Sequence, residues 1–348
     1  MIIDSIGNIL EAEAEALVNT VNTQGIMGKG IALQFKLAFP ANFKAYQSAC
    51  RSGLVKLGKM LVFDRGLLES PRFIINFPTK EHWKEKTKID SINQGLQDLI
   101  QVIKERNIHT IAMPPLGCGL GGLDWNIVKP LIIEGLSSIR DVGIYIFSPQ
   151  GAPRPDIMSV ATDKPKLSIA KAALIKIMNE YLMPGYRLSR LEIQKLAYFL
   201  QIAGIQELKL AYIQKKYGPY AANLEHLLTS MEGHYTRGFG DKTSEQIAQP
   251  SIRVKTEEIE ETNDFLKDKQ DLIARIMRVE QLIEGFETPY GLELLSSVHW
   301  VVRVNPSIKN DVEAIIRAVH EWNYHKKAVM KAEHIKVAYD RLYKLNWF

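Results

Sequence analysis

Cysteine, excess charge and long apolar runs are all scarce in this chain of 348 residues. Its two cysteines, Cys50 and Cys118, are too few for a disulfide framework or a four-cysteine zinc site. No apolar run approaches the roughly 20 residues that cross a bilayer, and the start, Met-Ile-Ile-Asp, has no signal-peptide pattern. We therefore expect a cytoplasmic protein that is neither exported nor inserted into a membrane.

The net charge of +5 is too small to indicate a domain-wide nucleic-acid-binding surface. Residues 1–155 carry 17 Lys and Arg against 14 Asp and Glu, and the rest of the chain carries 27 against 25. The eight histidines show no HExxH or paired CxxC spacing, so we expect no metal site. We also expect no bound cofactor. Any contact with nucleic acid must therefore be local.

The first 150 residues alternate short apolar runs with amphipathic helical patterns, which is typical of an α/β sandwich. The apolar runs predict strands at 17–21, 59–63, 73–77, 110–113 and 143–147. Helices are predicted at 30–39 and 89–106, and Asp124 is expected to be the N-cap of a further helix. We predict about six strands with helices on both faces of the sheet, in three layers.

The pattern changes after Phe147, because Ser148–Asp156 contains three prolines and a glycine, which favour an extended connector. We predict an α/β domain over 1–155, a linker over 156–165 and a helical domain over 166–348. Helical periodicity marks the segments 166–183, 188–203, 220–231, 256–284, 290–302, 309–324 and 329–344. The segment 232–251 is predicted to be a long loop.

Two glycine-bearing loops, Thr23–Gly30 and Pro115–Gly122, each follow a predicted strand. Glycines at such a turn let backbone amides approach phosphate oxygens, and the end of a helix favours the anion. Together the loops suit a diphosphate held from both sides, whereas each alone also fits a tight turn. Lys29 is followed by Gly30, so the hydroxyl of a P-loop is missing and an ATPase is excluded.

Five segments carry a pattern that is specific in order and spacing: Ile6–Ile9, Val18–Asn22, Gly28–Ala32, Pro114–Trp125 and Tyr145–Pro149. They resemble the macrodomain family of ADP-ribose-binding modules, and within it the DarG-type antitoxins. That resemblance implies an enzyme that removes ADP-ribose from thymine in single-stranded DNA, where a DarT-type toxin attaches it. Asn76–Lys80 adds a Thr-Lys element shared with macrodomain hydrolases that release ADP-ribose from protein glutamate.

The resemblance also assigns the ligand-binding residues. It implies that Asn8 and Ile9 bind the adenine with Phe147 nearby, and that Asn22 binds the distal ribose. Many macrodomains have Asp at the position of Asn8, although an Asn carbonyl can still accept from the adenine amino group. The resemblance implies that the two loops bind the diphosphate, through Gly28, Lys29, Gly30 and Ile31 and through Leu116, Gly117, Cys118, Gly119, Leu120 and Gly121.

Lys80 is the expected catalytic residue. Cleavage of the bond to the thymine nitrogen builds negative charge on the leaving base, which a lysine ammonium can stabilise. The neutral amine is an alternative, because it can attack the sugar and form a Schiff base. Gly121 stands where the glutamate hydrolases have Asp, so no loop carboxylate acts there. Without the resemblance, Lys80 would be read as a solvated lysine in a charged stretch.

Two further features of this half have alternative interpretations. Lys84, Lys86 and Lys88 lie among His82 and Trp83, which suits single-stranded DNA but equally fits a solvated helix start. A thiol in a phosphate loop is conceivable as a nucleophile, but we interpret Cys118 as a small side chain that supports the loop.

The helical half contains Gln194–Phe199 and Tyr217–Tyr220, with the sequences QKLAYF and YGPY. These resemble the helical antitoxin-associated family called Panacea, which implies a module that binds the toxin. The Gly-Pro pair is expected to turn the chain into the next helix. Five acids crowd one segment and either mimic DNA phosphates for a basic toxin groove or form a solvated helix face: Glu257, Glu258, Glu260, Glu261 and Asp264.

The leading hypothesis is therefore an antitoxin that hydrolyses the bond between ADP-ribose and thymidine in single-stranded DNA and binds its toxin through the helical half. A second hypothesis is a reader that binds ADP-ribose without cleaving it. A third is an enzyme that hydrolyses ADP-ribosyl-glutamate or O-acetyl-ADP-ribose.

Overall fold

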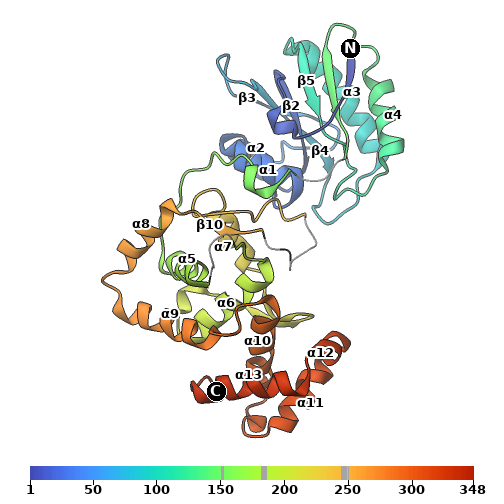
Figure 1. Ribbon diagram of the computed structural model, residues 1–348. Helices are drawn as coiled ribbons and strands as arrows, with labels where there is room; N and C mark the ends of the chain where they lie inside the picture. Colours follow the sequence, from blue (N-terminus) through green and yellow to red (C-terminus); the bar gives the residue numbers. More distant parts are fainter. Residues whose placement is uncertain (150–152, 182–185, 244–248, 250) are drawn as a thin grey trace. The chain divides into compact units, whose positions relative to one another are not determined.

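The computed structural model describes the chain except for residues 150–152, 182–185, 244–248 and 250. The chain divides into two compact units (Figure 1). The first comprises Met1–Asp163 together with Gly240–Thr243, and the second comprises Lys164–Phe239 and Ser244–Phe348. Parts of the predicted connector and of the predicted loop 232–251, and the end of the predicted helix 166–183, lie outside the described residues.

A six-stranded sheet in the order β1-β6-β5-β2-β4-β3 forms the centre of the first unit. Neighbouring strands are parallel except β3, which runs antiparallel to β4 at one edge. The strands are β1 (Ile2–Ser5), β2 (Ala16–Asn22), β3 (Leu61–Asp64), β4 (Phe73–Lys80), β5 (Thr110–Met113) and β6 (Gly143–Phe147). The five predicted strands are all present, and the short edge strand β1 was not among them.

Helices cover both faces of this sheet (Figure 1). Alternation along β2 sends Val18 toward α3 (Ile89–Glu105) and α4 (Trp125–Leu136), and Leu17 toward α1 (Gly30–Ala38). α2 (Pro40–Arg51) packs on the α1 side through Tyr46. The predicted three-layer α/β/α arrangement is therefore confirmed.

The helices follow their sequence patterns closely. In α3 the buried residues Ile92, Leu96, Leu99 and Ile103 form one stripe, and each contributes about 1.5–3 kcal/mol by leaving water. Asp124 caps α4 by accepting from the amide of Asn126 at 2.9 Å, as predicted.

The helix predicted to stop near Pro40 is followed at once by another helix. The residue before a proline is pushed out of the helical region, and Phe39 has φ −130° and ψ 69°. Proline is nevertheless well suited to the first turn of a helix, so Pro40 ends α1 and begins α2. The prediction missed α2 because it used the proline only as a stop signal.

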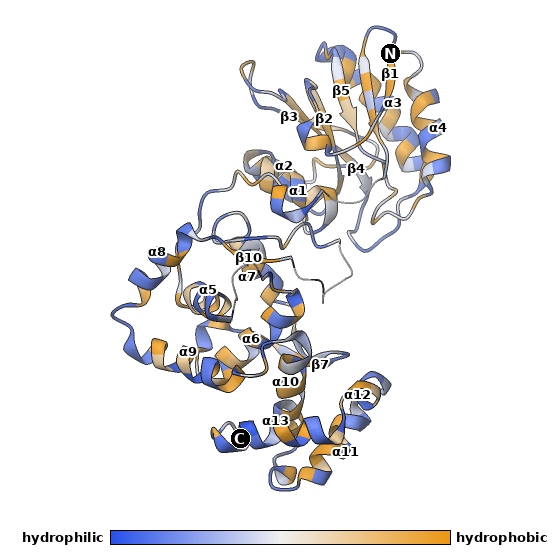
Figure 2. Cartoon of the chain, in the orientation of Figure 1, coloured by the Kyte–Doolittle hydropathy of each residue, from blue (hydrophilic) through white to orange (hydrophobic). Residues whose placement is uncertain are grey.

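The second unit is mainly helical, as predicted. Its α-helices are α5 (Ile169–Tyr181), α6 (Arg190–Ile202), α7 (Leu224–Met231), α8 (Glu257–Leu266), α9 (Gln270–Ile283), α10 (Pro289–Val304), α11 (Val312–Trp322), α12 (Tyr324–Val329) and α13 (Ala332–Lys344). Residues Gly291–Leu295 of α10 are all buried, so this helix is central to the core. Figure 2 shows that α8 and α9 each carry both hydrophilic and hydrophobic residues along their length.

Three predictions in this unit were wrong. The segment 256–284 is two helices, because Leu266 and Leu272 are six residues apart and six residues do not return to one helical face. The Gly-Pro pair does not turn into a helix but begins β8 (Gly218–Ala221), which pairs antiparallel with β7 (Tyr212–Lys215). The predicted loop 232–251 contains β9 (Thr236–Arg237), which pairs with β10 (Arg253–Val254).

Candidate functional site

The carboxyl ends of β2 and β4 place two predicted site residues opposite each other. Asn22 is the last residue of β2 and is aligned with Lys80, the last residue of β4. A register shift between Val21 and Asn22 precedes this pair. Such ends of parallel strands are where open α/β sheets bind ligands.

The ammonium group of Lys80 points to the second glycine loop. Its Nζ donates to the carbonyl oxygen of Leu120 at 3.4 Å and to that of Glu85 at 3.3 Å. Burial lowers the pKa of Lys80, the charge of Lys86 lowers it further, and the charge of Glu85 opposes both. These features distinguish Lys80 from a freely solvated surface lysine.

The side chain of Asn22 organises the first glycine loop. Its Oδ1 accepts from the amides of Gln24 at 2.9 Å and Ile26 at 3.3 Å, and its Nδ2 donates to the carbonyl of Ile26 at 2.6 Å. The hydroxyl of Tyr46, which is fully buried in α2, donates to the Asn22 carbonyl at 2.5 Å. Most of the hydrogen-bonding capacity of the Asn22 side chain is therefore used within the protein. The contact of Tyr46 with Asn22 was not predicted from the sequence.

The first glycine loop leads directly into α1. Gly28 and Lys29 are exposed, whereas the amide of Gly30 already donates to the carbonyl oxygen of Asp241 at 2.8 Å. Gly30 has φ +62°, in the left-handed region that favours glycine. The predicted set of diphosphate-binding amides therefore changes, because Gly30 has a protein partner in this structure.

Backbone hydrogen bonds from residues outside the second glycine loop hold two of its carbonyl groups. The amide of Leu123 donates to the carbonyl of Gly117 at 3.0 Å, and that of Thr87 donates to the carbonyl of Gly121 at 3.0 Å. A Cβ at Gly121 would lie 2.3 Å from Thr87 Oγ1 and 2.4 Å from the Gly117 oxygen. Gly121 therefore has no room for a side chain, whereas a Cβ at Gly119 meets nothing within 4 Å.

Thr87 was missed by sequence reasoning. It is 4% exposed, and Oγ1 has no hydrogen-bond partner among the residues that the structure describes. Thr87 lies at the end of a charged stretch that has no helical or strand periodicity. The sequence pattern therefore could not predict that its side chain is buried under the second glycine loop.

Cys118 does not have the character of a nucleophile. Burial raises the pKa of its thiol to about 11, and the nearby charge of Asp124 acts in the same direction. The Sγ atom donates to the carbonyl of Leu116 at 3.5 Å, within the same loop. A neutral thiol that supports the loop fits these contacts.

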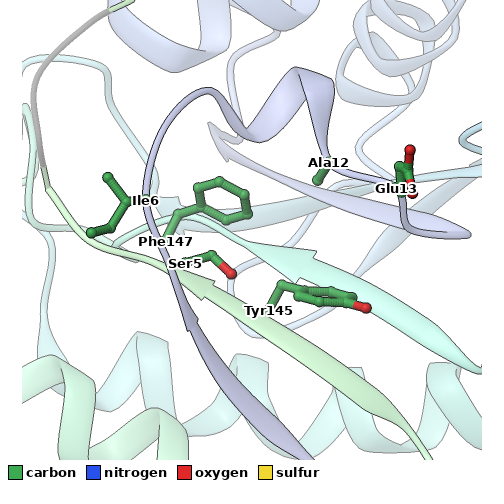
Figure 3. Close-up of a pocket in the computed structure, with 6 residues that line it drawn as sticks. All are labelled: Ser5, Ile6, Ala12, Glu13, Tyr145 and Phe147. Carbon is green, nitrogen blue, oxygen red and sulfur yellow. The ribbon is translucent and has the colours of Figure 1, made fainter.

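The predicted adenine end contains a cavity of about 340 Å³ (Figure 3). Phe147 lines it, with Tyr145 two residues earlier on the same face of β6. Asn8 and Ile9 do not line it. The sequence prediction named Phe147 but not the other lining residues: Ser5, Ile6, Ala12, Glu13 and Tyr145.

Asn8 and Ile9 instead have structural contacts. Asn8 caps the short helix η1 (Ile9–Glu11) by accepting from the amide of Leu10 at 3.1 Å, and its amide donates to Glu11 at 3.0 Å. Ile9 is 5% exposed and packs in the core on the α1 side of the sheet.

The charged stretch after Lys80 is a turn and not the start of a helix, because α3 begins at Ile89. His82 and Trp83 stack with ring centroids 5.6 Å apart, and Trp83 is 47% exposed. Lys84 Nζ lies 4.9 Å from the Trp83 ring centroid. An exposed ring beside a cation is a surface suited to stacking with a base.

The two motifs of the helical unit hold each other. Gln194 exchanges two hydrogen bonds with the backbone of Ala221, at 2.9 and 3.0 Å. The buried Lys195 donates to the carbonyl of Pro219 at 2.8 Å, and burial lowers its pKa to about 7. The motifs therefore join α6 to β8 and have a structural role.

The acidic cluster lies on α8 and is partly neutralised. Glu258 and Glu261 both accept from Lys164, and Glu257 lies 3.3 Å from Lys255. Paired acids present less negative charge to a basic partner, which weakens the interpretation as a phosphate mimic.

Within the described residues, no group of His, Cys, Asp and Glu could hold a metal ion. None of the helices in that part of the chain is long and apolar enough to cross a membrane.

Parts of this chain are similar in sequence to known proteins. The Macro domain family model matches residues 18–132. A DNA ADP-ribosyl transferase-DNA ADP-ribosyl glycohydrolase fusion protein of Thermosipho africanus is 32% identical over 43% of this chain and 42% of its own. Among solved structures, the macrodomain of Thermus aquaticus DarG is 50% identical over 43% of this chain and 99% of its own, with a TM-score of 0.42.

The similarity to one relative extends along almost the whole chain. The DNA ADP-ribosyl glycohydrolase of Thermus aquaticus is 46% identical over 338 residues, which are 97% of this chain and 92% of that protein. With a macrodomain in its first half, the chain therefore belongs to the DarG family of DNA ADP-ribosyl glycohydrolases.

Proposed function

We propose that this protein hydrolyses the N-glycosidic bond between ADP-ribose and a thymidine base in single-stranded DNA. The observation that carries the proposal is Lys80, a half-buried residue whose ammonium lies 3.4 Å from the Leu120 carbonyl in a glycine loop suited to phosphates. The whole-length similarity to a DNA ADP-ribosyl glycohydrolase supports the same activity.

The ligand would lie along the carboxyl ends of the strands. The cavity beside Phe147 suits the adenine, because aromatic and apolar lining is typical of base pockets. The exposed amides around Gly28 and the second loop would hold the diphosphate, and the distal ribose would then reach the Asn22–Lys80 pair.

The chemistry requires one bond to break and one to form. The bond from the anomeric carbon to the thymine nitrogen breaks with its electrons leaving on the base, and a water oxygen bonds to the anomeric carbon. The Lys80 ammonium stabilises the charge on the base and supplies its proton, which the lysine regains from the attacking water. The products are ADP-ribose and DNA with an intact thymine.

A covalent route through Lys80 is the second possibility for the same site. Burial and the charge of Lys86 lower the pKa of Lys80, which favours the neutral amine that a Schiff base requires. Reduction with borohydride distinguishes the routes, since only the covalent route leaves ADP-ribose attached to the protein.

A reader that binds ADP-ribose without hydrolysis is the second candidate function. It is favoured by Gly121, where the loop backbone leaves no space for a carboxylate.

One assay separates these functions. The full chain and Lys80→Ala are incubated with ADP-ribosylated single-stranded oligonucleotide and, separately, with a protein ADP-ribosylated on glutamate. We expect release from the DNA by the wild type and a loss of about 100-fold or more in Lys80→Ala, with ADP-ribose still bound. Binding without release from either substrate would establish a reader, and release from protein alone would refute the DNA activity.

We further propose that the helical unit binds a DarT-type toxin. The Thermosipho africanus protein that joins a transferase to a glycohydrolase in one chain supports a functional pairing of the two activities. Reversing the charge of Glu257 and Glu261 tests the α8 surface, with toxin affinity as the readout. Unchanged affinity would exclude the acidic cluster as the toxin contact.

A further inference from the structure

A short segment from beyond the macrodomain sequence completes the first unit. Gly240–Thr243 belongs to the compact unit that contains the sheet. The Asp241 carbonyl accepts from the amide of Gly30 at 2.8 Å, and Asp241 Oδ2 accepts from Gln34 Nε2 at 2.7 Å. Gln34 follows Gly30 by one helical turn, so both bonds lie on one face of α1.

These contacts are buried and fully paired. Asp241 is 4% exposed and Gln34 is 5% exposed. The other carboxylate oxygen of Asp241 accepts from the amide and hydroxyl of Thr243, at 3.0 and 2.6 Å. Buried hydrogen bonds to a charged group are among the stronger ones, and a carboxylate is favoured at the amino end of a helix.

The segment is attached where the first glycine loop becomes a helix. Lys29 is the N-cap of α1 but makes no side-chain capping bond, and Gly30 has φ +62°. The bond from Gly30 to Asp241 therefore fixes the junction. A Cβ built at Gly30 would lie 3.4 Å from Thr243 Cγ2 and 3.7 Å from Leu120 Cδ1, so the segment and the second loop both reach this junction.

We propose that Asp241 is a positioning residue that keeps the first glycine loop in the conformation that binds the ADP-ribose diphosphate. This inference rests on the proposed function, because it assumes that the loop binds that ligand. A loop that is already ordered binds at a lower entropic cost than a mobile one. Asp241 therefore acts on affinity for ADP-ribose and leaves the chemistry at Lys80 unchanged.

Exchanging the donor and the acceptor tests this role in the full-length protein. Gln34→Glu places two carboxylates together and is expected to weaken ADP-ribose binding by about tenfold in calorimetry. Gln34→Glu combined with Asp241→Asn restores one donor and one acceptor, and we expect recovery to within about twofold of the wild type. With ADP-ribosylated oligonucleotide, KM rises in the single variant whereas kcat does not change.

Controls separate this role from general stability and from the proposed function. Asp340→Asn, on the exposed face of α13, should bind ADP-ribose like the wild type. If thermal unfolding shows that the Gln34→Glu variant is not folded, the Asp241→Ala variant is measured in its place, with the same expected loss of affinity. Wild-type affinity in the single variants, or no recovery in a folded double variant, overturns the inference. A wild type that binds no ADP-ribose refutes the proposed function itself.

Discussion

Lys80 donates a hydrogen bond to the carbonyl oxygen of Leu120, which joins the end of a central strand to the second glycine loop at 3.4 Å. Lys86 lies against the same loop, because a Cβ at Gly122 would be 2.7 Å from its Nζ. Two lysine side chains therefore reach one loop, and the Glu85 carboxylate beside them accepts from the amide of His82.

Replacing Lys86 should change the pH dependence of the reaction. The charge of Lys86 lowers the pKa of Lys80, so Lys86→Met raises it. If the Lys80 ammonium is the active form, activity is lost as pH rises through this pKa, and the alkaline limb of kcat moves to higher pH in the variant.

The matched control is Lys84→Met, since Lys84 lies over the Trp83 ring. The pH dependence of kcat in Lys84→Met should match that of the wild type. A profile that rises with pH in the wild type would contradict the ammonium role and favour the nucleophile.

Gly121→Asp should not create a glutamate hydrolase. The added side chain would overlap Thr87 Oγ1 and the Gly117 carbonyl, so the loop must distort. We expect ADP-ribose affinity to fall by about tenfold to 100-fold in calorimetry, with no release from protein glutamate. Gly119→Ala has open space and should bind within about twofold of the wild type. Glutamate-linked release by Gly121→Asp would show that the loop accommodates a carboxylate.

The exposed Trp83–Lys84 pair should contribute to DNA binding. If Lys84 contacts a phosphate, Lys84→Ala lowers the slope of log affinity against log salt concentration by about one for ADP-ribosylated single-stranded DNA. Lys104→Ala, at the far end of α3, should keep the wild-type slope. An unchanged slope in Lys84→Ala would mean that this turn is only a solvated surface.

Acid should destabilise the helical unit through His299. Its Nε2 donates to the Trp347 carbonyl at 3.1 Å, and its Nδ1 lies 2.6 Å from the Tyr198 hydroxyl, which donates to it when the ring is neutral. Burial lowers the pKa of His299 to about 4, whereas the unfolded side chain is protonated below about 6.5. The free energy of unfolding should therefore fall by roughly 2–3 kcal/mol as pH drops from about 6.5 to 4.

Hydrogen exchange of α10 amides measures this effect in the unit concerned. His299→Gln should be less stable than the wild type near pH 7 and should lose this pH dependence. His226→Gln, an exposed substitution in α7, should keep it. An equal acid response in His299→Gln would assign the effect to other groups.

The sequence predicted those parts of the fold that depend on local pattern. The apolar runs at 110–113 and 143–147 are the strands β5 and β6 with the predicted bounds, because buried parallel strands are nearly continuous apolar segments. β1 was missed because it is a four-residue edge strand with an exposed Asp4. The hairpin β7–β8 was missed because Gly-Pro is also a turn signal.

The site was less accessible to prediction. The resemblance alone predicted the catalytic role of Lys80. The alternation of Tyr145 and Phe147 along one strand indicates that both side chains lie on one face of the sheet, and this pattern could have predicted the aromatic side of the cavity. Thr87 and Asp241 had no such signal, because their positions depend on tertiary contacts. The bond between Gln34 and Asp241 spans 207 positions in sequence, and no local pattern connects residues so far apart.

That distance also has a consequence for the order of events on the ribosome. The strands and helices of Met1–Asp163 are made first, and residues 164–239 follow before Asp241 is added. At the usual pace of synthesis this delay is on the order of ten seconds, which is long compared with the folding of a domain of this size. The nascent macrodomain therefore folds while the Gly30 amide and the Gln34 side chain are still hydrated. The hydrogen bonds between Asp241 and the start of α1 form only after translation has passed residue 241.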